Sequence, residues 1–216
     1  NAAAVFTRNH FPGAPIILGR ETIRGGRLRA IIANSKCSNV ATGDEGVRRA
    51  RRMAAAAAAE VGTSADRVLV SSTGVIGVPL PIEKIEVGVK GIMGDLSDDP
   101  LLGAEGIMTT DTHPKALSVS VGEATITFVA KGSGMIEPNM ATMICFLFTD
   151  ADFSAEVLKG CLADAVQDSF NMLTVDGDTS TNDIVILTAT GRKQGRIEDF
   201  SEALRFVCMD LARQMA

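Results

Sequence analysis

The chain has 216 residues, of which 46% are hydrophobic and 22% charged, and its formal net charge at pH 7 is −5. A chain of this length and composition can bury a core, so it is not intrinsically disordered, and none of its apolar runs reaches the roughly 20 residues of a membrane-spanning helix. The acidic charge and the 4% of aromatic residues, with neither Trp nor Tyr, argue against a nucleic-acid-binding surface.

Short apolar runs alternate with helical segments along the first half of the chain. We predict strands at Leu28–Asn34 and Arg67–Ser72, on either side of a helix at Gly46–Val61 that is rich in Ala, Arg and Met. Two short helices follow, one at Glu83–Val89 and one that ends near Met108.

The second half contains the clearest strand signals. Two segments that alternate in polarity around a glycine-containing turn predict a β-hairpin, at Ala116–Val121 and Thr125–Ala130. Further along we predict a strand, a helix, a strand and a helix, at Thr142–Thr149, Ser154 to about Met172, Ile184–Ala189 and Phe200–Ala216. This irregular alternation favours a layered α+β fold over a doubly wound parallel sheet.

The four cysteines are far apart in the sequence and form no C-x-x-C pair, which indicates neither a zinc site nor a disulfide framework. Reduced thiols are typical of cytoplasmic proteins, and we expect that location. The chain begins with Asn1, and its last predicted helix runs to Ala216 without a terminating residue. We therefore expect residues 1–216 to form a single domain that is a fragment, truncated at both ends.

Several common site motifs are absent or incomplete. The run Asp176–Asp183 is similar to a calcium loop, but Thr181 and Leu187 stand where such loops carry Gly and Glu. No glycine-rich nucleotide-binding loop occurs, and the two histidines, His10 and His113, lie in no recognisable nucleophile motif. We therefore predict neither a metal nor a cofactor.

The most informative segment is Lys131–Met143, in which a glycine-containing loop and a proline lead to Thr142 at the start of an apolar strand. This layout is typical of an N-terminal nucleophile. Its hydroxyl attacks the preceding carbonyl, here that of Ala141, and the resulting shift of the acyl group from nitrogen to oxygen breaks the peptide bond and frees the threonine amine; water then hydrolyses the ester. An α-amino group with a pKa of about 8 is then the base beside its own hydroxyl. Spacing alone favours the alternative that Thr142 is an ordinary β-branched strand residue.

Four long motifs change that balance. Together, and in this order, they resemble the ornithine acetyltransferase (bifunctional glutamate N-acetyltransferase) family of arginine biosynthesis, over nearly the whole chain. The motifs are Ser72–Pro81, Met108–Thr112, Lys131–Thr142 and Thr174–Asp183. The resemblance implies a layered α/β/β/α sandwich.

Members of that family cleave themselves before the Thr of an M-A-T-M motif, which predicts a cut between Ala141 and Thr142. The α chain, 1–141, and the β chain, 142–216 here, would stay associated, in a heterotetramer. The family moves an acetyl group from N-acetylornithine to glutamate through an acetyl-threonine intermediate, and some members also accept acetyl-CoA as donor. The resemblance thus makes Thr142 the nucleophile and a substrate-binding residue, and it makes Thr73 and Gly74 the oxyanion hole. One such donor is typically worth about 3–4 kcal/mol.

Two further residues acquire roles by resemblance. Lys131 matches a family lysine that contacts substrate near the nucleophile, and Thr112 is the residue of Thr109–Thr112 that the alignment selects for substrate contact. Without the neighbouring motifs, Lys131 is an ordinary solvated lysine and Ser72-Thr73-Gly74 a strand-ending turn. For Asp176–Asp183 we infer only a structural role, since Asp and Ser side chains tie turns together by local hydrogen bonds.

The chain departs from the family pattern in one loop. Members usually carry N-S-G-N-A-N-A where this chain has Asn34–Val40, so that Lys36 and Cys37 replace a glycine and an asparagine. If the loop borders the site, acceptor preference is expected to differ; otherwise the change is tolerated surface variation. Family chains also continue past this C-terminus into further substrate-binding residues, so the predicted activity concerns the full-length parent.

Two other functions remain open at this point. An amidohydrolase or aminopeptidase with the same self-cleaving architecture passes the acyl group to water, and its rate is independent of glutamate. A non-catalytic homologue stays uncleaved and loses nothing on Thr142→Ala.

We expect the intact mass of the full-length protein under denaturing conditions to give two fragments, the second of which begins at Thr142. Thr142→Ala is expected to give one uncut chain, because it lacks the attacking hydroxyl. Thr125→Ala, outside the motif, serves as the control and is expected to be cut like the parent. A single uncut chain from every protein contradicts this mechanism.

Overall fold

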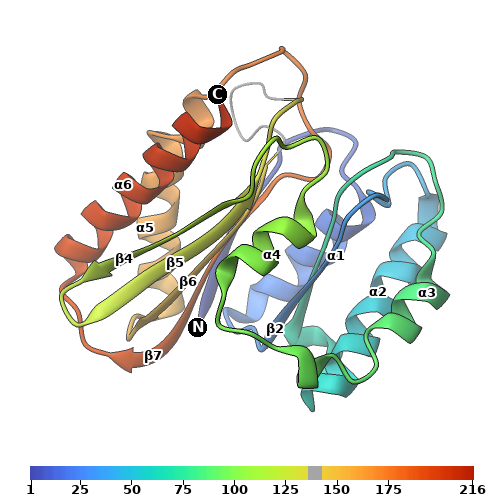
Figure 1. Ribbon diagram of the computed structural model, residues 1–216, viewed down its shortest axis with the longest axis horizontal. Helices are drawn as coiled ribbons and strands as arrows, with labels where there is room; N and C mark the ends of the chain where they lie inside the picture. The colour runs from blue at the N-terminus through green and yellow to red at the C-terminus, as the bar shows by residue number, and fades with distance from the viewer. Residues whose placement is uncertain (136–142) are drawn as a thin grey trace.

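The computed structural model describes residues 1–135 and 143–216, which form a five-stranded and a two-stranded sheet (Figure 1). The strand order in the larger sheet is β1-β7-β6-β5-β4. Strands β6 and β7 pair in parallel, and the other neighbours pair antiparallel. The bounds are β1 Ala2–Phe6, β4 Lys115–Val121, β5 Ala124–Lys131, β6 Ile144–Ala151 and β7 Ile184–Lys193. The smaller sheet pairs β2 (Ala30–Asn34) with β3 (Val68–Ser72) in parallel.

The helices complete four layers. Helices α5 and α6 lie together on one face of the larger sheet, and the smaller sheet lies beyond the other face, with α4 against β4 and β5 (Figure 1). Helix α2 packs on the smaller sheet, next to α1 and α3. The helices are α1 Ala14–Thr22, α2 Gly43–Val61, α3 Ile82–Gly88, α4 Pro100–Ile107, α5 Ala155–Gln167 and α6 Ile197–Met215. The predicted α/β/β/α layering is confirmed.

The larger sheet is buried on both faces. Along β6, Cys145 and Leu147 pack toward α5 and α6, whereas Ile144 and Phe146 pack toward the smaller sheet. Strand β7 repeats the same alternation. Because successive strand residues point to opposite faces, a strand covered on both sides reads as a continuous apolar run. This is why β6 and β7 are visible in the sequence.

Local signals account for the ends of several elements. Gly122 adopts φ 61° in the two-residue turn between β4 and β5, which confirms the predicted hairpin. The Ser154 hydroxyl accepts a hydrogen bond from the Val157 amide, 3.3 Å away, and caps α5 as expected. Gly62, at φ 70°, ends α2.

The structure also corrects the predicted elements. Helix α5 ends at Gln167 and not near Met172, because Ser169 leaves the helical conformation and Phe170–Met172 forms a separate 3₁₀ turn. Strand β1 and helix α1 were not predicted. Strand β1 is a five-residue edge strand that gains its stability by pairing with β7, which no local signal reveals.

The cysteines are free and buried: Cys37, Cys145, Cys161 and Cys208. Burial raises the pKa of the Cys208 thiol to about 12, so that thiol is unreactive. Among the residues that the structure describes, no group of three or more His, Cys, Asp or Glu side chains is placed to hold a metal ion. The same residues include no helix both long and apolar enough to cross a membrane.

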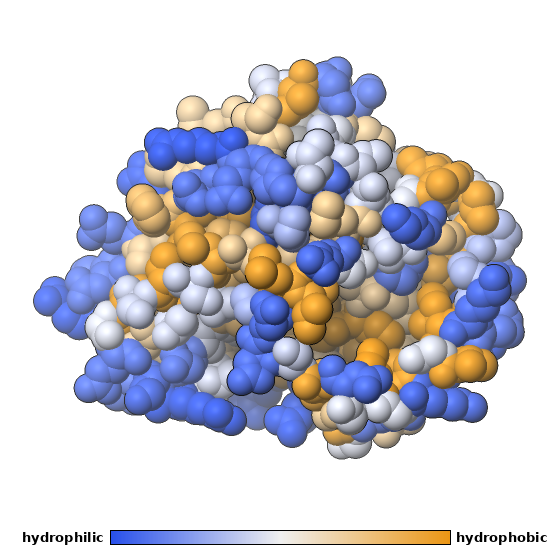
Figure 2. Space-filling model, in the orientation of Figure 1, coloured by the Kyte–Doolittle hydropathy of each residue, from blue (hydrophilic) through white to orange (hydrophobic). Residues whose placement is uncertain are grey.

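The stretch from α3 to α4 carries several exposed apolar side chains: Val87, Ile92, Met93, Leu96, Leu101 and Leu102. Figure 2 shows the apolar patches on this face of the molecule interrupted by hydrophilic side chains.

A single buried amide joins the two sheets. Asn182 lies two residues before β7, and its Nδ2 donates to the carbonyl of Ser38, at 2.7 Å, and to the carbonyl of Ser72, at 2.9 Å. Ser72 is the last residue of β3, and all three residues are buried. The side chain of Asn182 therefore fixes the end of the smaller sheet against the larger one.

We expect Asn182→Ala to lower the free energy of unfolding by about 2–4 kcal/mol, because it leaves two buried carbonyls without a donor. Urea unfolding followed by circular dichroism measures this change. The control is Asn171→Ala, since Asn171 bonds to the Gln167 side chain at the surface; it is expected to change the same quantity by less than about 0.5 kcal/mol. Equal effects of the two substitutions would show that Asn182 does not join the sheets.

Candidate active site

A small cavity lies where the ends of β3 and β5 meet the starts of β6 and β7. Thr73 and Gly74 follow β3, Lys131 ends β5, Met143 precedes β6 and Asp183 precedes β7, and all five line the cavity. Three residues predicted from two separate motifs, Thr73, Gly74 and Lys131, are therefore brought together.

The predicted cleavage site, Ala141 and Thr142, lies outside the described residues. Met143, the next residue in the chain, is 1% exposed and lines the cavity. Its N–H donates to Asp183 Oδ1 at 3.0 Å. The chain thus continues from the predicted nucleophile directly into the cavity wall.

The turn after β3 has two donors available. The Thr73 amide donates to the Asn34 carbonyl, at 3.0 Å, but the Thr73 hydroxyl accepts from Lys131 and keeps its own hydrogen. The Gly74 N–H has no hydrogen-bond partner among the described residues. Gly74 adopts φ 127°, and a Cβ there would collide with the Lys36 backbone, so the turn requires glycine. Two hydrogens without an acceptor among the described residues, one on the Thr73 hydroxyl and one on the Gly74 amide, suit the predicted oxyanion hole.

The atypical loop Asn34–Val40 borders this turn through its backbone. The Val75 amide donates to the Lys36 carbonyl at 3.1 Å. Lys36 adopts φ 77°, a conformation that glycine reaches without strain, which explains the glycine usual in the family at this position. The Lys36 side chain is exposed, and neither it nor Cys37 lines the cavity. Neither replacement therefore places a side chain in the cavity wall.

Lys131 is 3% exposed and held by two threonines. Its Nζ donates to Thr109 Oγ1 at 2.9 Å and to Thr73 Oγ1 at 3.3 Å. Burial lowers the pKa of Lys131, and the carboxylates of Asp111 and Asp183 act in the opposite direction. A fixed cation beside the Thr73 hydroxyl suits the predicted contact with a substrate carboxylate.

Asp111 ties the 109–112 segment to the end of β5. Its carboxylate accepts from the Gly132 amide at 2.7 Å, the Thr109 amide at 3.2 Å and the Lys115 ammonium at 3.1 Å. Burial acts to raise the pKa of Asp111, but these hydrogen bonds outweigh it and the pKa is lowered. The Asp111–Lys115 pair is a buried support for the position of Thr109.

Thr112 is not brought to the cavity. Its side chain is exposed, and its hydroxyl lies 3.1 Å from the ring Nδ1 of His113. In this segment Thr109 contacts Lys131, and the role of Thr112 in substrate binding stays a prediction.

The motif Asp176–Asp183 was expected to have only a structural role, but its last two residues, Asn182 and Asp183, line the cavity. Asp183 is fully buried, and this burial raises the pKa of its carboxyl to about 7. The available signal was an acidic side chain directly before the apolar run at 184–187, a place where solvent is excluded.

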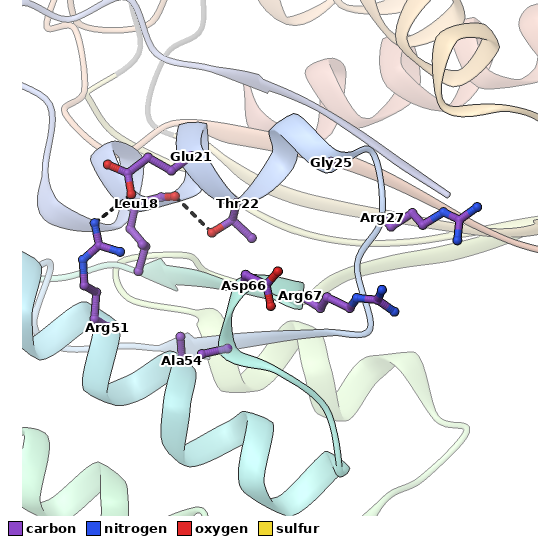
Figure 3. Close-up of a pocket in the computed structure, with 10 residues that line it drawn as sticks. Leu18, Glu21, Thr22, Gly25, Arg27, Arg51, Ala54, Asp66 and Arg67 are labelled. Atoms are coloured by element: carbon purple, nitrogen blue, oxygen red, sulfur yellow. Dashed lines mark hydrogen bonds and ion pairs between the residues drawn. The ribbon is translucent and has the colours of Figure 1, made fainter.

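A larger cavity, of about 470 Å³, lies between α1, α2 and the turn before β3 (Figure 3). Arg51 and Glu21 form an ion pair at its rim, at 2.7 Å, while Arg27 and Arg67 extend to one side. None of the residues singled out from the sequence lines it. The groups able to do chemistry converge on the smaller cavity, which is the candidate active site.

The whole chain, residues 1–216, matches the model of the ArgJ family. The chain belongs to the ArgJ family. It is 50% identical over 196 residues to the arginine biosynthesis bifunctional protein ArgJ of Thermotoga neapolitana, covering 88% of this chain and 49% of that protein. It is 49% identical over 224 residues to the glutamate N-acetyltransferase of Methanothermobacter thermautotrophicus, covering 100% and 56%. The chain spans about half the length of the curated relatives it matches.

Two solved structures share its fold. The ornithine acetyltransferase of Mycobacterium tuberculosis, complexed with ornithine, aligns with a TM-score of 0.56 and 31% identity over 67% of this chain and 77% of that chain. The ArgJ structure from Bacillus halodurans aligns with a TM-score of 0.53 and 34% identity over 65% and 76%. The family and the fold class predicted from the sequence are confirmed.

We expect Lys131→Met to raise the pKa of Asp183 above its value of about 7, since the Lys131 cation stabilises the ionised carboxylate. Carboxyl-carbon NMR across a pH titration measures this shift. Lys159→Met, which changes an exposed lysine on α5, is expected to leave the Asp183 titration unchanged. An unaltered titration in Lys131→Met would show that the cation does not act on Asp183.

Proposed function

We propose that the complete protein transfers an acetyl group from N-acetylornithine to glutamate, in arginine biosynthesis. The names of the relatives support this activity: one is a glutamate N-acetyltransferase, and another is an arginine biosynthesis protein. The observation that carries the proposal is that Thr73, Gly74 and Lys131 line one cavity. Met143, the residue that follows Thr142 in the sequence, lines the same cavity.

The first half-reaction acetylates the enzyme. The free amine of Thr142 takes the hydroxyl proton, the hydroxyl oxygen attacks the acetyl carbonyl of acetylornithine, and the Thr73 hydroxyl and Gly74 amide hold the oxyanion. When the tetrahedral intermediate collapses, the ornithine amine leaves with the proton. An acetyl ester remains on Thr142.

The second half-reaction reverses these steps with another amine. The amino group of glutamate attacks the ester, the same oxyanion hole holds the new intermediate, and the Thr142 hydroxyl is released with its proton. Both amino acids carry an α-carboxylate, which suits the buried cation of Lys131. Thr112 is proposed as a further substrate contact.

Because the acetyl group travels on a side chain, the proposed reaction requires no bound cofactor. Acetyl-CoA is a second candidate donor, which would enter as a substrate. In the same proposal the α and β chains stay associated as a heterotetramer, and the enzyme works in the cytoplasm.

We expect the protein as the cell produces it to form acetylglutamate from acetylornithine and glutamate. Thr73→Val is expected to lower kcat about a hundredfold, because it removes one oxyanion donor and keeps the shape of the side chain. Thr127→Val, in which the lost hydroxyl faces Ser118 on β4, is expected to keep full activity. Mass spectrometry of the products measures both rates.

Two results would contradict this proposal. Acetate released at the same rate with and without glutamate would indicate a hydrolase. The absence of transfer from both acetylornithine and acetyl-CoA would indicate a protein without this activity.

A further inference from the structure

Asp183 and its neighbour hold the start of β6 from two sides. The Asp183 Oδ1 accepts the Met143 N–H at 3.0 Å, and the Ile184 N–H donates to the Met143 carbonyl at 3.0 Å. Since a peptide group is planar, a hydrogen bond to the Met143 amide also orients the peptide that joins Met143 to the preceding residue. That residue is Thr142, the proposed nucleophile.

The second oxygen of the same carboxyl group, Oδ2, is buried and accepts no hydrogen bond of good geometry in the described part of the chain, although the nearby hydroxyls of Ser180 and Thr7 act to lower the pKa of Asp183. The side chain is fully buried in the wall that also carries Thr73 and Lys131. Such a carboxyl is costly to ionise, as its raised pKa shows. Asparagine has the same shape and would accept the Met143 hydrogen bond without that cost. Stability alone therefore does not account for the acid.

We propose that Asp183 is a positioning residue: Oδ1 fixes the peptide that follows Thr142, and the ionised carboxylate keeps Lys131 charged at the oxyanion turn. This inference rests on the proposed function, since it assigns Asp183 a role in presenting that nucleophile. Asp183 itself takes no part in bond making or breaking.

One charged group, Lys131 at the end of β5, acts directly on Asp183. Asp111, which lies before β4, and Lys115, in β4, act in turn on Lys131. Asp111 and Asp183 stabilise the Lys131 ammonium, and Lys115 opposes them. Protonation of Asp183 removes one of the two supporting charges. We therefore expect the rate of self-cleavage to fall as the pH drops through about 7.

The rate of self-cleavage measures this pH dependence without interference from the Thr142 amine. Before cleavage Thr142 has no free amine, so the titration of that amine does not overlap with that of Asp183. Intact mass of freshly synthesised protein, followed over time at several pH values, gives the cleavage rate.

The deciding variant is Asp183→Asn, with Asp150→Asn as its matched control. Asp150 also accepts a backbone amide, that of Thr125 at 2.8 Å, but near the other end of β6. Asp183→Asn is expected to slow self-cleavage and kcat for acetyl transfer about tenfold to a hundredfold, with KM for acetylornithine nearly unchanged. It should also abolish the fall in cleavage rate near pH 7. The control variant is expected to behave like the parent.

Thermal stability separates a positioning role from a structural one. The pKa of Asp183 is raised from 3.8 to about 7, so its contribution to stability is fully present below pH 3.8 and is lost as the pH rises through 7. The side-chain amide of the Asp183→Asn variant does not ionise, so the variant does not lose this stability. The melting temperature of Asp183→Asn relative to the parent is therefore expected to increase with pH across that range.

A variant that loses activity and melting temperature together at pH 8 would make Asp183 a structural residue and overturn this role. Full activity with an unchanged pH profile would overturn it as well. An active parent is the reference for both comparisons. If the parent itself neither cleaves nor transfers acetyl groups, the proposed function fails first and this role fails with it.

Discussion

The dipeptide Asn182-Asp183 is the constraint on which the geometry of the site depends. One side chain donates to carbonyls at the end of the smaller sheet, and the next accepts an amide at the start of β6. Thr73 and Gly74 follow a strand of the smaller sheet, whereas Lys131 ends one strand of the larger sheet and Met143 precedes another. The cavity has a defined shape because Asn182 fixes the two sheets relative to each other, while Asp183 fixes the start of β6 beside the start of β7.

Apolar packing between the sheets is necessary for this arrangement but does not specify it. Leu69 of β3 belongs to the same buried apolar cluster as Ile144 and Phe146 of β6, and such packing is favourable over a range of relative positions. Buried hydrogen bonds are directional, and they are costly when broken. The polar cluster around Lys131 therefore adds geometric definition to a core whose bulk stability comes from its apolar layers.

The sequence predicted those parts of the molecule whose signal is local. The two-sided strands β6 and β7, the hairpin at Gly122 and the cap at Ser154 each follow from a few adjacent residues. Strand β1 was not predicted because its stability comes from pairing with β7 and not from its own five residues. Thr73, Gly74 and Lys131 were found through long motifs, but no spacing rule shows which threonine of 109–112 turns toward Lys131. Asp183 was read as a turn residue because burial is a property of the assembled layers.

The strand order has a consequence for the two chains that a cut after Ala141 would create. Strands β6 and β7 come after that point and lie in the middle of the sheet, between β5 on one side and β1 on the other, both of which come before it. The strands of the second chain are thus inserted between strands of the first and hydrogen-bonded to them on both sides. It cannot peel away from an open edge, and its release requires two hydrogen-bonded ladders to break at once. Cleavage would free a new terminus without loosening the molecule, and separated chains would have to reopen the sheet before they could rejoin.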